Sequence, residues 1–203
     1  MGNRNPYRIS IDSRTGFLYW GEIGPDGNND SLNLGPKGYD EINQAQKAGN
    51  FGWPYLIADN QAYHSRDYIE STSGAVFDSL APINDSPNNT GIRELPPAQP
   101  AMIYYPYAAS DKFTALGSGA RNAMAGPIYY NEDYPDSDVK WPDYFDGKLL
   151  AYDWKNEPDF AQYEVQQYHR YGFWPRWCAV LFRIWVGLVL AECERNPFAN
   201  RVY

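Results

Sequence analysis

Residues 7–22, YRISIDSRTGFLYWGE, decide the local fold of the chain. Ile9 and Ile11 alternate with polar residues, which is typical of a strand that buries one of its faces. The segment that follows, DSRTG at residues 12–16, contains the small polar residues and the glycine that favour a turn. Phe17–Gly21 then returns as a second strand, so this stretch predicts a β-hairpin.

The composition of the whole chain favours the same kind of structure. Its 203 residues include 17 Gly, 16 Pro, 18 Tyr, 9 Phe and 7 Trp. Turn-forming and aromatic residues in these numbers favour short strands joined by turns over long helices. We therefore predict an all-β fold with no helix before residue 160 and with further strands at residues 39–43, 101–107, 123–130 and 147–154.

Length and charge exclude several classes of protein. A chain of 203 residues corresponds to one or at most two domains. The net charge of −8 argues against a nucleic-acid partner, because phosphate binding needs clustered Lys and Arg. No apolar run has the length of a membrane-spanning helix, and no signal peptide is recognised at the start of the sequence.

Two segments differ from the strand pattern. Residues 58–100 are polar and rich in proline, and we interpret residues 58–116 as an insertion into a unit that spans residues 1–160. Residues 161–203 differ in charge: they hold 3 Glu and 5 Arg but no Asp or Lys, whereas residues 1–160 hold 22 acidic and 12 basic residues.

The segment 161–203 has the character of an out-of-frame translation. One codon choice for YHRYGFWPRWCA, residues 168–179, encodes IIDMDFGPDGA when it is read one base later. That string has the same hairpin pattern as residues 7–22, so we expect the frame to be lost near residues 159–162. The alternative is an apolar helix at Trp177–Ala191, which could associate with a membrane but, at about 15 residues, is short for a span.

Four motifs follow one another in the first quarter of the chain. RNP at residues 4–6 precedes the hairpin, and GEIGPDG at residues 21–27 ends it. YDEIN at residues 39–43 and GNFGWPY at residues 49–55 come next. In this order the motifs resemble those of the soluble quinoprotein glucose dehydrogenases, the glucose/sorbosone dehydrogenase family.

The resemblance extends over about residues 3–155 and implies a fold. GSGARNAMAGPIYY at residues 117–130 and PDYFDGKLLAYDW at residues 142–154 are similar to a further blade of that family. Its members are six-bladed β-propellers. We therefore expect residues 1–160 to form a partial six-bladed β-propeller of two to three blades.

The family oxidises aldoses with pyrroloquinoline quinone (PQQ) and calcium, so the resemblance assigns cofactor-binding residues. Arg4 and Asn5 would face PQQ, and a guanidinium suits its carboxylates because it is a forked donor with a permanent charge. Lys155 occupies a place where members often carry a basic residue that contacts PQQ. The alternative for Arg4 is an exposed arginine in a connecting loop.

The resemblance also assigns calcium ligands. The carbonyl groups of Gly24 and Pro25 would face the ion, because calcium prefers oxygen ligands. The alternative is an ordinary Gly-Pro turn. Asp40, with Glu41, would either orient this loop or bind a second, structural calcium. Both carboxylates could instead form an ordinary solvated or hydrogen-bonded pair.

These assignments predict a fragment of a PQQ-dependent sugar dehydrogenase, which oxidises the C1 hydroxyl of an aldose with hydride transfer to PQQ. The family's catalytic histidine precedes the RNP motif, so no residue is assigned as catalytic and the chain alone is expected to be inactive. The implied partners are a sugar, a cytochrome or other electron acceptor, and the missing propeller blades, in the periplasm or outside the cell. The alternative is a non-catalytic propeller that binds carbohydrate or a protein.

Overall fold

The computed structural model describes residues 1–153 and 179–183 of the chain, and strands dominate these ranges. Helical structure in them is limited to three short 3₁₀ turns, so none of their helices has the length and apolar character to cross a membrane. The predicted all-β class is thereby confirmed. The three turns are η1 (Thr114–Leu116), η2 (Asn131–Asp133) and η3 (Asp143–Phe145).

The hairpin predicted from residues 7–22 is present. Strand β1 (Pro6–Ile11) pairs antiparallel with β2 (Leu18–Glu22). The turn between them is closed by two backbone bonds of 2.9 Å, from Asp12 N to the Phe17 carbonyl and from Gly16 N to the Asp12 carbonyl. The buried Asp12 carboxylate also accepts a bond from the backbone N–H of Arg14, which stabilises the turn.

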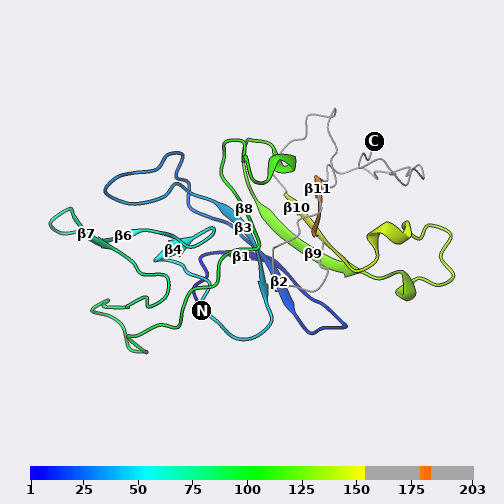
Figure 1. Ribbon diagram of the computed structural model, residues 1–203, viewed down its shortest axis with the longest axis horizontal. Coiled ribbons are helices and arrows are strands. Elements are labelled where there is room, and N and C mark those ends of the chain that lie inside the picture. Colours follow the sequence, from blue (N-terminus) through cyan, green and yellow to red (C-terminus); the bar gives the residue numbers. More distant parts are fainter. Residues whose placement is uncertain (154–178, 184–203) are drawn as a thin grey trace.

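The hairpin continues into a four-stranded antiparallel sheet with the order β1-β2-β3-β8 (Figure 1). Strand β3 (Asp40–Ala45) pairs with β2, and β8 (Ile103–Tyr105) pairs with β3. Both strands lie where the sequence predicts them. Because β8 follows β3 only after a long excursion of the chain, the sheet brings distant segments of sequence together.

A second sheet has the order β11-β10-β9. Strand β9 (Ala123–Tyr129) pairs antiparallel with β10 (Lys148–Asp153), and both strands lie where the sequence predicts them. Strand β11 (Ala179–Arg183) pairs parallel with β10. The alternative of a helix at Trp177–Ala191 is therefore wrong over β11. The frame hypothesis for residues 161–203 stays a prediction, since most of that segment lies outside the described residues.

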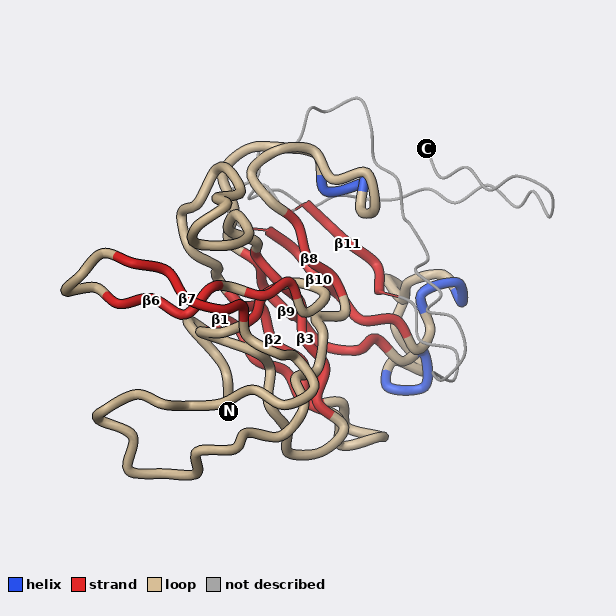
Figure 2. The backbone as a smooth tube through the Cα atoms, turned by 60° about the vertical axis from the view of Figure 1, so that its left-hand side comes forward, coloured by secondary structure: helices blue, strands red, loops and turns tan. Residues whose placement is uncertain are grey.

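The insertion contains more regular structure than its polar sequence indicates. Strand β4 (Leu56–Ile57) pairs with β5 (Gln61–Ala62), and β6 (His64–Asp67) pairs with β7 (Thr72–Val76). Figure 2 shows the β6–β7 hairpin projecting away from the two larger sheets. Strand β4 lies just before the insertion, and its two buried residues are too short a run to predict a strand. Strands β5, β6 and β7 were not predicted because their side chains are mostly polar or exposed and lack an apolar alternation.

The main core lies between the two larger sheets. Strand β9 packs across β1 and β2, and the buried residues come from both layers. The sheets approach so closely at Gly21 that a Cβ atom there would lie 2.0 Å from the Ala123 carbonyl oxygen. The core side chains include Tyr19, Ile42, Ile103 and Tyr105 from the first sheet and Ala123, Ala125, Leu149 and Ala151 from the second.

One expectation about the hairpin is wrong. The alternation predicts that Ile9 and Ile11 lie on the buried face of a half-buried strand, but they are 61% and 68% exposed. The register explains this, because Ile9 lies opposite Trp20 and Ile11 opposite Leu18, on the face of the sheet that points away from β9. This apolar face of β1 is therefore open within the described residues.

Candidate functional site

The backbone of Arg4 and Asn5 is held by a buried carboxylate at the end of the hairpin. Oε1 of Glu22 accepts the backbone N–H of Arg4 at 2.6 Å and that of Asn5, and Oε2 accepts the Trp20 indole N–H at 3.1 Å. Burial raises the pKa of Glu22, and the two backbone donors oppose that shift. The corner at residues 4–5 is thus fixed to the end of β2.

The Arg4 side chain reaches the residue before the Gly24-Pro25 turn. Its Nη1 donates to the Ile23 carbonyl at 2.8 Å, and its guanidinium carbon lies 5.7 Å from the centroid of the Trp53 ring. Arg4 is exposed, and a guanidinium has five N–H donors. The remaining donors therefore suit an anionic ligand such as a carboxylate, and the PQQ-facing role of Arg4 stays a prediction.

The Gly24-Pro25 turn is packed tightly against the segment before β3. The Gly24 N–H donates to Oδ1 of Asp40 at 3.1 Å. A Cβ atom at Gly24 would lie 1.8 Å from the carbonyl oxygen of Tyr39, so only glycine fits there. Since Gly24 directly follows Ile23, the structure brings Arg4 and this turn together at one end of the first sheet.

Asp40 connects three segments of the chain. It is 1% exposed, and its Oδ2 accepts the backbone N–H of Ala123 at 2.9 Å while its Oδ1 holds Gly24. Burial raises the pKa of Asp40 to about 6, against the opposing effects of the Ala123 N–H and the Arg121 charge. Among the alternatives for Asp40, this geometry corresponds to a residue that orients the loop.

Sequence reasoning did not connect Arg121 with this site. The side chain is buried, and its Nη2 donates to the Pro25 carbonyl at 2.9 Å while Nη1 donates to the Tyr105 carbonyl at 3.3 Å. Its Nε lies 3.6 Å from Oδ1 of Asp40, and its guanidinium carbon lies 3.9 Å from the centroid of the Tyr107 ring. A buried cation therefore occupies the inner side of the Gly24-Pro25 turn.

This arrangement does not fit a calcium ion at Pro25 or Asp40. The Pro25 carbonyl already accepts from a guanidinium, whose charge would repel a divalent cation beside it. Both oxygens of Asp40 accept backbone donors and are buried. Residues 1–153 contain no group of three or more His, Cys, Asp or Glu side chains suited to holding a metal.

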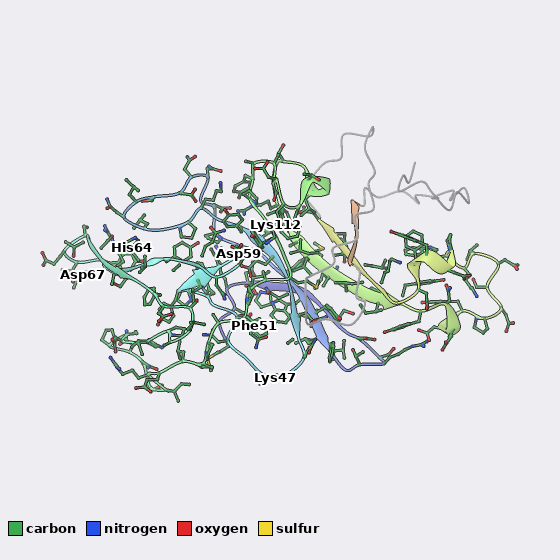
Figure 3. All side chains as sticks on the ribbon, viewed as in Figure 1. Lys47, Phe51, Asp59, His64, Asp67 and Lys112 are labelled. Atoms are coloured by element: carbon green, nitrogen blue, oxygen red, sulfur yellow. The ribbon has the colours of Figure 1, made fainter. Side chains whose placement is uncertain are left out.

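Lys155, the third predicted PQQ contact, falls outside the described residues. His64, the one histidine in the described residues, lies on the β6–β7 hairpin, where its Nδ1 is 2.8 Å from the Gly74 carbonyl oxygen (Figure 3). It therefore does not take part in the site around Arg4.

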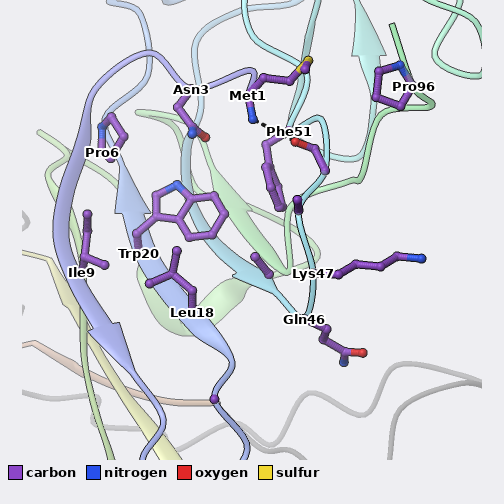
Figure 4. Close-up of a pocket in the computed structure, with 14 residues that line it drawn as sticks. Met1, Asn3, Pro6, Ile9, Leu18, Trp20, Gln46, Lys47, Phe51 and Pro96 are labelled. Carbon is purple, nitrogen blue, oxygen red and sulfur yellow. Dashed lines mark hydrogen bonds between the residues drawn. The ribbon is translucent and has the colours of Figure 1, made fainter.

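An apolar groove of about 610 Å³ opens on the face of the first sheet that points away from β9 (Figure 4). The rings of Trp20 and Phe51 meet edge to face in its wall, with centroids 4.6 Å apart. Asn3 and Pro6, on either side of Arg4 and Asn5 in the sequence, also line it. The corner therefore lies next to the rim of the groove.

Comparison with known protein families gives a match over residues 1–83, which is less than half of the chain. This stretch matches the model for glucose/sorbosone dehydrogenases, and it contains Arg4, Asn5, Gly24, Pro25 and Asp40. The resemblance derived from the four motifs is thereby confirmed over residues 1–83. Searches of the curated proteins and of the solved structures gave no match.

Proposed function

We propose that the chain is part of a PQQ-dependent sugar dehydrogenase, and that Arg4 binds an anionic group of the cofactor. The observation that supports this most directly is the exposed Arg4 guanidinium beside the Gly24-Pro25 turn, within the stretch that matches the glucose/sorbosone dehydrogenase family. When bound, PQQ would accept the hydride from the C1 hydroxyl carbon of an aldose.

In this proposal the chain's own residues bind and orient. Glu22 fixes the backbone of Arg4 and Asn5, so the guanidinium projects from a rigid corner instead of a mobile loop. The Ile23 carbonyl takes one N–H of the Arg4 fork, and the outward donors could bind a carboxylate in two-pronged geometry. Lys155 as a second cation toward PQQ stays a prediction.

We expect Arg4→Gln to weaken PQQ binding about 10- to 100-fold, since a hydrogen bond to a charged group contributes about 1.5–3 kcal/mol. Binding of PQQ to the purified chain is measured by quenching of tryptophan fluorescence. Arg93→Gln is the matched control, because Arg93 pairs with Asp85 on an exposed loop and its loss removes the same charge. The absence of PQQ binding, or equal weakening in both variants, would contradict the role of Arg4.

We also propose that the four-stranded sheet is one blade of a β-propeller and that the second sheet is part of the next blade. The antiparallel order β1-β2-β3-β8 and the face-to-face contact with β9 support this arrangement. Further blades would cover the groove and the exposed isoleucines of β1. An open apolar face of this kind favours self-association in their absence.

The double change Ile9→Ser and Ile11→Ser is expected to shift the isolated chain toward the monomer, because it removes the most exposed apolar side chains of β1. Light scattering coupled to size-exclusion chromatography measures the shift. The pair Leu32→Ser and Ile69→Ser is the control, since these side chains are also highly exposed but lie in loops. Equal effects of the two pairs would indicate that β1 is not a specific contact surface.

A non-catalytic propeller that binds carbohydrate or a protein is the second candidate. The guanidinium of Arg121 at the Pro25 carbonyl favours it, because that oxygen was the predicted calcium ligand. Reconstitution of a full-length relative with PQQ and calcium distinguishes the two: reduction of a dye with aldoses supports the dehydrogenase. A periplasmic or extracellular location and a cytochrome or other electron acceptor belong to the dehydrogenase proposal.

A further inference from the structure

Three consecutive residues of the turn after β2 are each held by a side chain from a different part of the chain. The Gly24 N–H binds Asp40, and the Pro25 carbonyl accepts from Arg121. The Asp26 carboxylate accepts from the hydroxyl of Tyr107. Two side chains therefore anchor the backbone of the turn at Gly24 and Pro25, and a third holds the Asp26 side chain.

Arg121 also contacts both of the other anchoring side chains. The Arg121 guanidinium lies over the Tyr107 ring, 3.9 Å from its centroid, and Nε is 3.6 Å from the Asp40 carboxylate. Nη1 extends the cluster to β8 through the Tyr105 carbonyl. Arg121 thus joins the turn, β3 and β8 around one buried positive charge.

We infer that Arg121 is the cation that stabilises the Gly24-Pro25 turn. Its guanidinium binds the Pro25 carbonyl and compensates the charge of Asp40, so that the turn keeps its conformation without a divalent metal ion. Arg121 is a positioning residue in this inference, since it acts through the turn. The chain would differ in this respect from the calcium-binding arrangement that its family resemblance implies.

Charge and geometry both favour this assignment. Asp40 and Arg121 are 1% and 8% exposed, and Nε of Arg121 lies 3.6 Å from the carboxylate, so each charge lowers the cost of burying the other. A guanidinium can bind two carbonyl groups and face a carboxylate at once, because its donors point in fixed, diverging directions. A calcium ion placed at the same carbonyl would meet the Arg121 charge at short range.

The test compares thermal unfolding at pH 7.5 with 5 mM calcium or 5 mM EDTA. The Tm of the wild-type chain is expected to differ by less than about 1 °C, because a ligand that does not bind the native state cannot stabilise it. Arg121→Gln is expected to lower the Tm by about 5–10 °C, since it leaves Asp40 uncompensated. Arg121→Lys keeps the charge and should recover part of that loss.

Arg93→Gln is the control for the loss of one positive charge, and its Tm should be unchanged because its partner is exposed. If Arg121→Lys and Arg121→Gln lower the Tm equally, the charge of Arg121 does not matter and only its packing does, which would overturn the inference. A calcium-dependent rise of several degrees in the wild type would also overturn it. That wild-type measurement decides the matter even if Arg121→Gln does not fold.

The inference rests on the proposed function only in the choice of calcium as the competing ion. A failure of PQQ to bind would contradict the proposed function without changing any of these Tm values. Conversely, calcium binding to the wild type would overturn the role of Arg121 and leave the Arg4 assignment intact.

Discussion

Gly21→Ala is expected to destabilise the fold by about 3 kcal/mol, the upper part of the range for overpacked cores. The new Cβ atom would lie 2.0 Å from the Ala123 carbonyl oxygen and 2.6 Å from the Met124 amide nitrogen. Both obstructing atoms belong to the backbone of β9, so no side-chain rotation relieves the contact. The two sheets must move apart, and the core between them loses its close packing.

Urea unfolding followed by tryptophan fluorescence measures this loss, and calorimetry should show a fall in Tm of about 6–12 °C. Gly91→Ala is the matched control. The nearest atom to a Cβ atom there is Oδ1 of Asn89 at 3.5 Å, in an exposed loop, so its effect should stay within about 0.5 kcal/mol. If Gly21→Ala proved equally mild, the close contact between the sheets would be in error.

The strands of the first sheet and strands β9 and β10 could be predicted from sequence because their signals are local. Alternation of apolar residues and the turn at residues 12–16 locate the first hairpin, and β9 and β10 lie within a residue or two of their predicted bounds. The exposure of Ile9 could not be predicted in the same way. Alternation shows that a strand has an apolar face, but it does not show whether another layer covers that face.

Part of the site could also be predicted, because some of its residues are brought together by a local pattern of sequence. Arg4 reaches Ile23, the residue before Gly24, because a hairpin joins the segments that carry them, so this proximity follows from a local pattern. Glu22 gave a signal that was not used: it lies two residues after Trp20 and therefore on the same apolar face, where a carboxylate needs buried partners.

Arg121 could not be linked to the turn by any local pattern. It is separated from Pro25 by 96 residues, and it precedes β9 in a polar loop that gives no sign of burial. Only the packing of the second sheet on the first brings the two together. The sequence therefore predicts which residues form the turn, whereas the cation that holds it depends on tertiary structure.

Glu41→Gln is expected to stabilise the chain at pH 8 and to leave its stability at pH 4.5 nearly unchanged. The carboxylate is buried, and it accepts the Ala58 N–H at 2.6 Å and the Asn43 side-chain N–H at 3.0 Å. Burial raises its pKa from 4.5 to about 7, and the nearby charges of Glu22 and Asp40 add to this effect. The two hydrogen bonds oppose the shift but do not cancel it.

The sign of the pH dependence follows from this raised pKa. Between about pH 4.5 and 7 the folded state binds more protons at Glu41 than the unfolded state, so stability falls as the pH rises through that window. Glutamine stays neutral and removes this contribution, which is worth up to about 3 kcal/mol at pH 8 by the conversion of pKa shifts to free energy. The amide can still accept the Ala58 N–H, while a flipped Asn43 accepts its NH₂ group.

The free energy of unfolding of the two proteins is therefore compared from pH 4.5 to 8.5 by urea titration. Asp40 and Glu22, whose pKa values are also raised, contribute in the same direction to both curves. Because their charges interact with Glu41, the difference between the curves reports Glu41 together with this interaction. Glu70→Gln, on an exposed turn, should give a curve that runs parallel to that of the wild type. If the free energies of unfolding of the wild type and Glu41→Gln differ by the same amount at every pH, Glu41 does not titrate in this window. If the variant is less stable than the wild type at pH 8, the fold requires the charged form of Glu41.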